Sequence, residues 1–285
     1  MILITGALGF IGRNLVEQLK KEKKDFCCLV RETSDKKFFK EEGISHKAVN
    51  LGDMRQVKDA ISSLNATVII HLAAAINPTR RQAEQDLKAA KNLVEICKQK
   101  KGKLIFASSY LTDTYYKSLY GEYKRKAEDF IKASGINHTI LRISTVYGAH
   151  DRRNVSIIIS MVKGYKFVPI VDLSIQPVHV NDVVKIILMS LNKGKGVYNV
   201  AGDEIMSLEQ VVDIIANQCN RKIIKIRIPR FILYGYAWAL ALIGKKQLLE
   251  QLNNLSKLRG MDTIMTKKEF KIKFIGFKKG IQSVC

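Results

Sequence analysis

Tyr120 and Lys124, in the stretch SLYGEYKRKAE, are two residues whose types and spacing could carry out acid/base chemistry. Residues four apart share one face of a helix, so both side chains can point at one site. A phenol with a pKa near 10 is only about a thousandth ionised at pH 7, and a nearby ammonium favours the ionised form. Because lysine is abundant in this chain, roughly one such spacing arises by chance, so the pair has to be judged by the elements around it.

The segments around this pair alternate between short apolar runs and amphipathic stretches. The runs are rich in β-branched residues, and the stretches between them have helical periodicity, as at residues 11–24 and 79–101. The runs are MILIT, FCCLV, ATVIIHLA, KLIFAS and HTILRIS. This alternation predicts an α/β fold with a Rossmann-type doubly wound parallel sheet. After about residue 150 the alternation is less regular, which indicates a smaller C-terminal α/β lobe.

Three glycines, Gly6, Gly9 and Gly12, lie between the first expected strand and the first expected helix. Glycine permits a tight turn and a close backbone approach, while a helix N-terminus offers unpaired N–H groups to a phosphate. Three glycines at this place predict a dinucleotide-binding site. We therefore expect a dinucleotide-binding Rossmann domain over residues 1–150, to which residues 181–201 return, and a mainly substrate-binding lobe over residues 151–285.

Motifs along almost the entire chain resemble those of one family. They are TGALGFIG at 5–12, LGD at 51–53, HLAAA at 71–75, SS at 108–109, YGEYKRKAE at 120–128, LRISTVYG at 141–148, PVHVND at 177–182 and YNVAGDE at 198–204. In this order they resemble the extended short-chain dehydrogenase/reductases, also called NAD-dependent epimerases/dehydratases. The likeness is to the nucleotide-sugar epimerases and reductases of that family.

This resemblance implies three catalytic residues. Tyr120 would exchange a proton with the substrate hydroxyl or carbonyl, and Ser109 would hydrogen-bond the reacting oxygen. Lys124 would tune Tyr120 and hold the nicotinamide ribose. Only 11 residue steps separate Ser109 from Tyr120, and the V-Y-G that often follows this serine in the family is absent, so the family's substrate specificity cannot be transferred to this chain.

The resemblance also implies a set of cofactor-binding positions on the glycine turn, at the ends of later strands and on the catalytic helix. They are Gly6, Leu8, Gly9, Phe10, Ile11, Gly12, Arg13, Arg31, Asp53, Met54, Leu72, Ala73, Ala74, Tyr120, Lys124, Ile143 and Ser144. NAD enzymes usually carry an acidic residue at the end of the second strand, whereas this chain has Arg31 there. A guanidinium suits a 2′-phosphate, especially if Arg13 approaches as well, so we expect NADP or NAD with a slight preference for NADP.

The substrate expected from the resemblance is a nucleotide-linked sugar, converted by a 4-epimerase or a 4-keto reductase. Both reactions use the same residues. The positions expected near the substrate are Thr145, Tyr147, Arg152, Arg153 and Asn154, with the two arginines suited to a diphosphate. Two alternatives stay open: a non-catalytic cofactor-binding subunit for assembly or sensing, and a membrane-associated enzyme of lipid-linked sugars. A homodimer is expected because relatives are commonly dimers.

The composition leaves the partners of this basic chain open. The net charge of +22 could favour binding to nucleic acid, to an anionic membrane surface or to phosphorylated small molecules. The basic residues are scattered and no nucleic-acid-binding motif is present, so we expect no nucleic-acid partner. Five cysteines without a C-x-x-C motif fit neither a disulfide framework nor a zinc site, and we expect no metal. The first residues already resemble a core strand, which predicts a cytoplasmic protein.

One apolar segment, FILYGYAWALALIG at residues 231–244, stands apart from these motifs. At 14 residues it is too short to span a bilayer as a helix. The favoured interpretation is a buried helix. The alternative is a helix on a membrane surface, next to Lys245 and Lys246.

Overall fold

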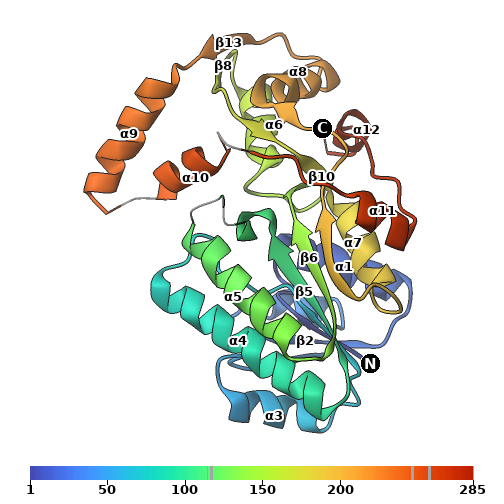
Figure 1. Ribbon diagram of the computed structural model, residues 1–285. Helices are drawn as coiled ribbons and strands as arrows, with labels where there is room; N and C mark the ends of the chain where they lie inside the picture. Colours follow the sequence, from blue (N-terminus) through green and yellow to red (C-terminus); the bar gives the residue numbers. More distant parts are fainter. Residues whose placement is uncertain (114, 116–117, 245–246, 256–257, 285) are drawn as a thin grey trace.

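The largest element of the fold is a parallel sheet of seven strands (Figure 1). The computed structural model describes residues 1–284 apart from 114, 116–117, 245–246 and 256–257. The strands, in sheet order, are β11 (Gly196–Val200), β6 (Asn137–Ile143), β5 (Lys103–Ser109), β4 (Val68–His71), β1 (Ile2–Thr5), β2 (Phe26–Val30) and β3 (His46–Ala48). Since β11 pairs with β6, the segment 181–201 contributes the edge strand of the main sheet.

Helices cover both faces of this sheet, because successive strand residues point to opposite faces. On one face, Ile2 and Ile4 of β1 join the core formed with α1 (Phe10–Lys21), α2 (Lys37–Glu41) and α7 (Val180–Met189). On the other, Leu3 joins the core formed with α3 (Met54–Ser62), α4 (Arg80–Gln99) and α5 (Leu119–Ala133). The predicted α/β fold with a doubly wound parallel sheet is therefore confirmed.

The strand order reverses at β1, whose neighbours are β2 on one side and β4 on the other. In open α/β sheets, ligands bind beyond the carboxyl ends of the strands at such a reversal. The glycine turn follows β1, and the HLAAA motif begins at the last residue of β4. Both therefore lie at the carboxyl ends of the strands beside this reversal. Two helix starts nearby are fixed by their caps: Thr79 and Gln82 form a capping box at α4, and the Ser118 side chain accepts a hydrogen bond from Gly121 N–H at α5.

A smaller lobe with its own core packs at this end of the sheet (Figure 1). Its core combines apolar side chains of α6 (Val155–Gly164), β8 (Phe167–Ile170), α8 (Leu208–Gln218) and α12 (Phe277–Ile281), together with Tyr147. The remaining elements are η1 (Tyr110–Thr112), β7 (Thr145–Tyr147), β9 (Ser174–Ile175), β10 (Pro177–His179), β12 (Met206–Ser207), β13 (Ile224–Arg227), α9 (Arg230–Leu242), α10 (Gln247–Leu255) and α11 (Ile264–Phe270). Phe270 of α11 packs into the core of the main sheet, so the chain returns to the first domain near its end.

The buried-helix interpretation of residues 231–244 is wrong. The segment is a helix, α9, but it projects from the smaller lobe and packs on α10 (Figure 1). Ala237 is its one fully buried residue, while Phe231 is 75% exposed and Trp238 is 62% exposed. Within the described part of the chain, no helix is both long enough and apolar enough to cross a bilayer. Lys245 and Lys246, which the alternative interpretation used, lie outside the described residues.

Candidate active site

The glycine turn after β1 leaves room that only glycine can provide. Gly6 has a φ of +76°, and a Cβ at Gly6 would lie 2.6 Å from the Ala73 nitrogen. A Cβ at Gly12 would collide with the Gly6 carbonyl oxygen. Gly9 is the N-cap of α1 and has no side chain that could cap the first N–H groups. These groups can therefore receive a phosphate, and the turn fits the pyrophosphate of a dinucleotide.

Thr5 connects this turn to the end of β4. Its hydroxyl accepts a hydrogen bond from Ala73 N–H at 3.3 Å and pairs with Nδ1 of His71 at 2.6 Å. His71 is 2% exposed, and burial lowers the pKa of His71 to about 3. This histidine is thus a neutral core residue. The contact fixes the spacing between the glycine turn and Ala73.

Tyr120 and Lys124 lie one turn apart on α5, and both face the ends of β4 and β5. The Lys124 Nζ donates to the Ala107 carbonyl at 2.7 Å and lies 5.8 Å from the centre of the Tyr120 ring. A cavity of about 20 Å³ lies between this helix and α4, and Asp86, Tyr120 and Lys124 are among the residues that line it. The pair predicted from its spacing is therefore brought together in space.

Burial and the neighbouring charges shift the pKa values of both Tyr120 and Lys124. Burial raises the pKa of Tyr120 to about 12, and the Asp86 carboxylate adds to the rise. Burial lowers the pKa of Lys124 to about 8, against the opposing effect of Asp86 and Glu128. In this site burial and the Asp86 carboxylate therefore disfavour the Tyr120 phenolate.

Asp86 on α4 has a second role. Its Oδ2 accepts a hydrogen bond of 2.7 Å from Ala75 N–H, which attaches the loop after β4 to α4. Burial raises the pKa of this carboxyl, opposed by the Ala75 N–H, Lys124 and Arg31. Asp86 therefore connects the loop that carries Ala73 and Ala74 with the Tyr120–Lys124 pair.

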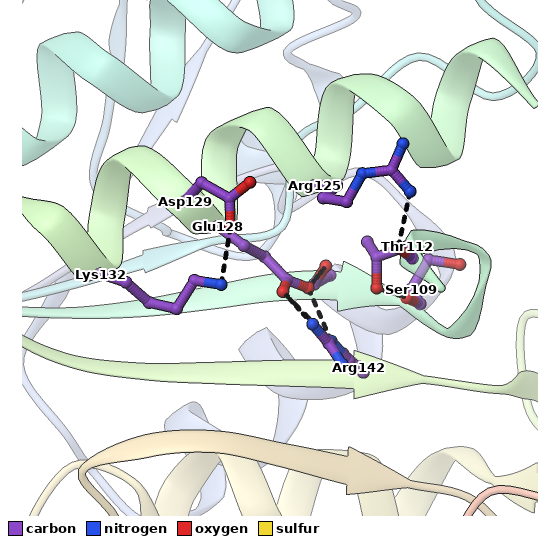
Figure 2. Close-up of polar contacts among 8 residues, drawn as sticks. Ser109, Thr112, Arg125, Glu128, Asp129, Lys132 and Arg142 are labelled. Atoms are coloured by element: carbon purple, nitrogen blue, oxygen red, sulfur yellow. Dashed lines mark hydrogen bonds and ion pairs between the residues drawn. The ribbon is translucent and has the colours of Figure 1, made fainter. Parts of the chain in front are cut away.

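An ion pair beneath the end of β5 holds α5 in place (Figure 2). Glu128, which is fully buried, accepts two hydrogen bonds from Nε of Arg142 and one of 2.6 Å from its Nη2. Ser108 donates to the same carboxylate at 2.5 Å. Because its hydroxyl is engaged in this ion-pair network, Ser108 is a structural residue.

Ser109 is the better catalytic candidate of the two serines. Among the described residues its hydroxyl accepts one long hydrogen bond, of 3.2 Å, from Leu111 N–H, and it can donate its own proton to another acceptor. Ser109 ends β5 and is 7% exposed. Arg125 of α5 donates to the Thr112 carbonyl at 3.1 Å and so fixes the turn that follows Ser109 (Figure 2).

A cavity of about 610 Å³ opens between the two lobes, next to Tyr120. This volume is in the usual range for small-molecule sites. Of the residues expected near the substrate, Thr145, Arg153 and Asn154 line it. The remaining lining residues are Ile76, Asn77, Pro78, Tyr110, Leu111, Ser118, Leu119, Tyr120, Val155, Ile158, Leu173, Ile175, Leu208, Gly244 and Glu250. The lining thus combines apolar side chains with the Arg153 cation, the Glu250 carboxylate and several hydrogen-bonding groups.

Tyr147 and Arg152 do not lie where we expected them. Tyr147 is 1% exposed, and its ring packs against His179 and Phe277 in the core of the smaller lobe. Arg152 lies on another surface, beside Met161 and Tyr165 of the smaller lobe. The turn after Asp151 separates Arg152 from Arg153, so this arginine pair cannot hold one diphosphate together in this arrangement.

Most of the expected cofactor positions lie near the carboxyl ends of the strands. Asp53 caps α3 by accepting from the N–H groups of Arg55 and Gln56, and Met54 begins that helix. Ile143 ends β6, and the adjacent Ser144 donates to the Gln176 carbonyl at 2.7 Å. The other positions on the turns and strand ends, Leu8, Phe10, Ile11, Leu72 and Ala74, are half-buried there.

Arg13 and Arg31 lie on the β2 side of the glycine turn. The guanidinium of Arg13 stacks 4.9 Å above the Phe38 ring, and Arg31 is exposed directly after β2. The neighbouring Glu32 pairs with Lys36 at 3.3 Å. A basic edge is therefore available where the ribose of an adenine nucleotide would bind.

Three parts of the site, Thr5, Asp86 and the loop 76–78, were not predicted from the sequence. Thr5 belongs to the TGALGFIG motif, so its place before Gly6 was an available signal. Asp86 sits in an ordinary helical pattern, and only the fold shows that it faces Tyr120. Residues 173, 208, 244 and 250 reach the cavity through the folding of the smaller lobe, which no local pattern predicts.

These features define a dinucleotide-binding α/β protein with a Tyr/Lys pair between its glycine turn and a substrate-sized cavity. The sequence profile of the NAD dependent epimerase/dehydratase family matches residues 2–201. The chain belongs to this family.

Individual relatives agree with this assignment. A protein of Methanocaldococcus jannaschii named "Putative UDP-glucose 4-epimerase" is 30% identical over 257 residues, which cover 76% of this chain and 82% of the relative. The UDP-glucose 4-epimerase of Thermotoga maritima, solved with UDP-glucose, has a TM-score of 0.80 at 19% identity, covering 99% of this chain and 96% of that one. The Bordetella bronchiseptica enzyme WbmG, solved with NAD, has a TM-score of 0.81 at 18% identity, covering 99% and 91%. At these identities the solved structures show a shared fold.

Proposed function

We propose that the protein is an NAD(P)-dependent oxidoreductase or epimerase acting on a nucleotide-linked sugar. The observation that carries this proposal is the position of Tyr120. Its side chain borders both the small cavity around Lys124 and the 610 Å³ cavity between the lobes. A proton held by Tyr120 can therefore reach a substrate in the larger cavity from the side on which the dinucleotide would bind.

We assign each of the three proposed catalytic residues a role that its surroundings support. In the reductive direction the buried Tyr120 phenol gives its proton to the substrate carbonyl oxygen as the carbon gains a hydride; in the oxidative direction the phenolate takes the hydroxyl proton. Lys124 provides positive charge beside the phenolate, and Ser109 donates a hydrogen bond to the reacting oxygen. When bound, the nicotinamide would supply or accept the hydride.

The sugar nucleotide as substrate class is supported by the cavity and by the relatives. Arg153 provides a cation at the cavity wall, and Asn154 and Thr145 provide hydrogen-bonding groups. The Thermotoga maritima relative was solved with UDP-glucose. Apolar residues such as Leu111 and Ile158 can pack against the faces of a base or a sugar.

The preference for NADP rests on the basic edge after β2. Arg31 occupies the end of β2, and Arg13 reaches the same side of the glycine turn. The ion pair of Glu32 with Lys36 engages the carboxylate that would compete for the ribose hydroxyls. Titration of the purified protein with NADP and NAD tests this preference, and equal affinities would remove it.

Arg31 also favours a 4-keto reductase over a 4-epimerase, because a consumed NADPH suits net reduction. The two activities differ in stoichiometry. The purified protein should be incubated with UDP- and dTDP-linked sugars and their 4-keto derivatives while the nicotinamide absorbance is followed. Loss of one NADPH per product identifies a reductase, whereas conversion of the sugar without net NADPH loss identifies an epimerase. Cofactor binding without conversion of any of these sugars would contradict the proposed substrate class.

The homodimer and the cytoplasmic location stay predictions. Sedimentation at several protein concentrations tests the first, and fractionation of cells at physiological salt tests the second.

A further inference from the structure

Ten of the exposed large apolar side chains belong to the ribbon and helix at one end of the smaller lobe. We define the α9 surface as the outward side chains of the β8–β13 ribbon and of the helix that follows it. They are Tyr165, Phe167, Ile224, Ile226, Phe231, Ile232, Tyr236, Trp238, Leu242 and Ile243, and each is at least 46% exposed. Phe167 is directly opposite Ile224 in the ribbon, so the two side chains lie on one face. In Figure 1, β13 at the top leads into α9, which runs down the outer left side of the smaller lobe.

After Arg230, its first residue, helix α9 carries no charged side chain on any face. Residues 231–244 contain no charged side chain. One side, with Ala237, faces inward, and α10 packs against this helix. The opposite side exposes two rows, 231, 235, 238, 242 and 232, 236, 239, 243, with the spacing of one helix face. A helix with this composition is normally buried, and a contiguous exposed apolar patch marks an interaction site.

The chain around the α9 surface is strongly basic. Between Asp213 and Glu250 the sequence contains no acidic residue, but it contains Arg221, Lys222, Lys225, Arg227, Arg230, Lys245 and Lys246. Arg221 and Lys222 are exposed directly before β13, and Lys166 is exposed beside Phe167. Three of these cations pair with carboxylates of the lobe: Lys225 with Asp213 at 3.0 Å, Arg227 with Glu209 at 3.2 Å and Arg230 with Asp172 at 2.8 Å. The segment between Asp213 and Glu250 is therefore basic, as is the whole chain with its net charge of +22.

The kinds of side chain on this surface suit the boundary of a lipid bilayer. Trp and Tyr prefer the level of the lipid headgroups, since each has an apolar ring and a polar group. Helix α9 has 13 residues, which is too short to span the hydrocarbon layer but long enough to lie in its surface. Flanking cations attract anionic headgroups and add to the binding from apolar burial.

We propose that the α9 surface docks on an anionic lipid bilayer, with α9 lying along the boundary between headgroups and acyl chains. A second copy of this chain is the less favourable occupant, because a symmetric contact through this surface would bring its cations against the same cations. The C-terminal end of α9 borders the 610 Å³ cavity through Gly244. Docking therefore holds the cavity close to the membrane surface, where a membrane-bound substrate could reach Tyr120. The docking itself does not depend on the proposed reaction.

The chain contains its own probe for this contact, because Trp238 is its single tryptophan. The protein is mixed with vesicles of equal parts phosphatidylglycerol and phosphatidylcholine, or of phosphatidylcholine alone. With the anionic vesicles we expect a blue shift of the emission, quenching by brominated acyl chains and co-flotation of the protein. Binding should weaken as salt is raised and should be weaker with phosphatidylcholine alone.

Paired substitutions locate the contact. Phe231→Ser with Leu242→Ser removes two exposed apolar side chains and should weaken partitioning by about tenfold or more. The matched control, Ile264→Ser with Met265→Ser, removes two residues of α11 that are 68% and 65% exposed and should leave partitioning unchanged. Circular dichroism and dinucleotide binding verify that both variants keep the fold.

Three results would overturn the proposal. The first is no binding of the wild-type protein to anionic vesicles. The second is an equal loss of binding in both paired variants. The third is a blue shift without vesicles that grows with protein concentration and is abolished by Phe231→Ser with Leu242→Ser, which would identify a second copy as the occupant.

Discussion

Replacing Asp86 by asparagine should move the pH dependence of the reaction to lower pH. The amide side chain of the Asp86→Asn variant would keep an oxygen that accepts from Ala75 N–H, but the negative charge that disfavours the Tyr120 phenolate would be lost. The rise of the Tyr120 pKa from 10.0 to about 12 corresponds to about 2.7 kcal/mol. Burial is the larger cause, so Asp86 accounts for less than half of this energy, or less than about one pH unit.

The same substitution should lower the pKa of Lys124, because the Asp86 carboxylate raises it. Both titrations of the coupled pair thus move in one direction. The assay is the pH profile of kcat/KM for oxidation of the nucleotide sugar identified by screening, in which the phenolate acts as base. Its rising limb should shift downward by a few tenths to about one pH unit. The matched control is Asp129→Asn, which alters an exposed carboxylate on α5 that pairs with Lys132. An unchanged limb, or a shift to higher pH, would refute the electrostatic role of Asp86.

Three further predictions test the cofactor site and its support. Gly12→Ala should weaken dinucleotide binding by at least about tenfold in calorimetric titration, because the new Cβ collides with backbone; Gly164→Ala, which has open space, should not. Arg31→Ala should weaken NADP binding more than NAD binding, and a parallel loss for both would remove Arg31 from 2′-phosphate recognition. Glu128→Ala leaves Arg142 without its buried partner and should lower the free energy of unfolding by about 3 kcal/mol in denaturant titration at pH 7; a loss below about 1 kcal/mol would show that the pair contributes little.

The sequence predicted the parts of the protein that depend on local pattern. The alternation of apolar runs with helical periodicity indicated the βαβ order, and the glycine spacing after β1 indicated the phosphate-binding turn. The Tyr120–Lys124 pair could be predicted because both residues lie on one helix, whose start after a strand-ending serine fixes their edge of the sheet. In each case the residues involved are close in sequence or belong to consecutive elements.

The remaining site depends on how distant segments pack, and there the predictions were less successful. Tyr147 follows directly after Thr145 and Val146, but its ring packs against His179 and Phe277, which come from later segments, in the core of the smaller lobe. The turn after Asp151 likewise separates Arg152 from Arg153. For residues 231–244, the composition predicts a helix that packs against an apolar surface. The composition does not indicate whether that surface belongs to the same chain. In this fold most of α9 has no apolar surface against it among the described residues.

Tyr120→Phe tests the central claim most directly, because it removes only the hydroxyl that we propose as the acid/base. Turnover of the nucleotide sugar should fall by about a hundredfold or more, while dinucleotide affinity stays within about twofold. Tyr123→Phe is the matched control on the same helix, since the Tyr123 hydroxyl donates to the exposed Glu84 carboxylate at 3.3 Å. We predict that this control retains turnover. Unchanged turnover of Tyr120→Phe, with intact cofactor binding, would contradict the proposed mechanism.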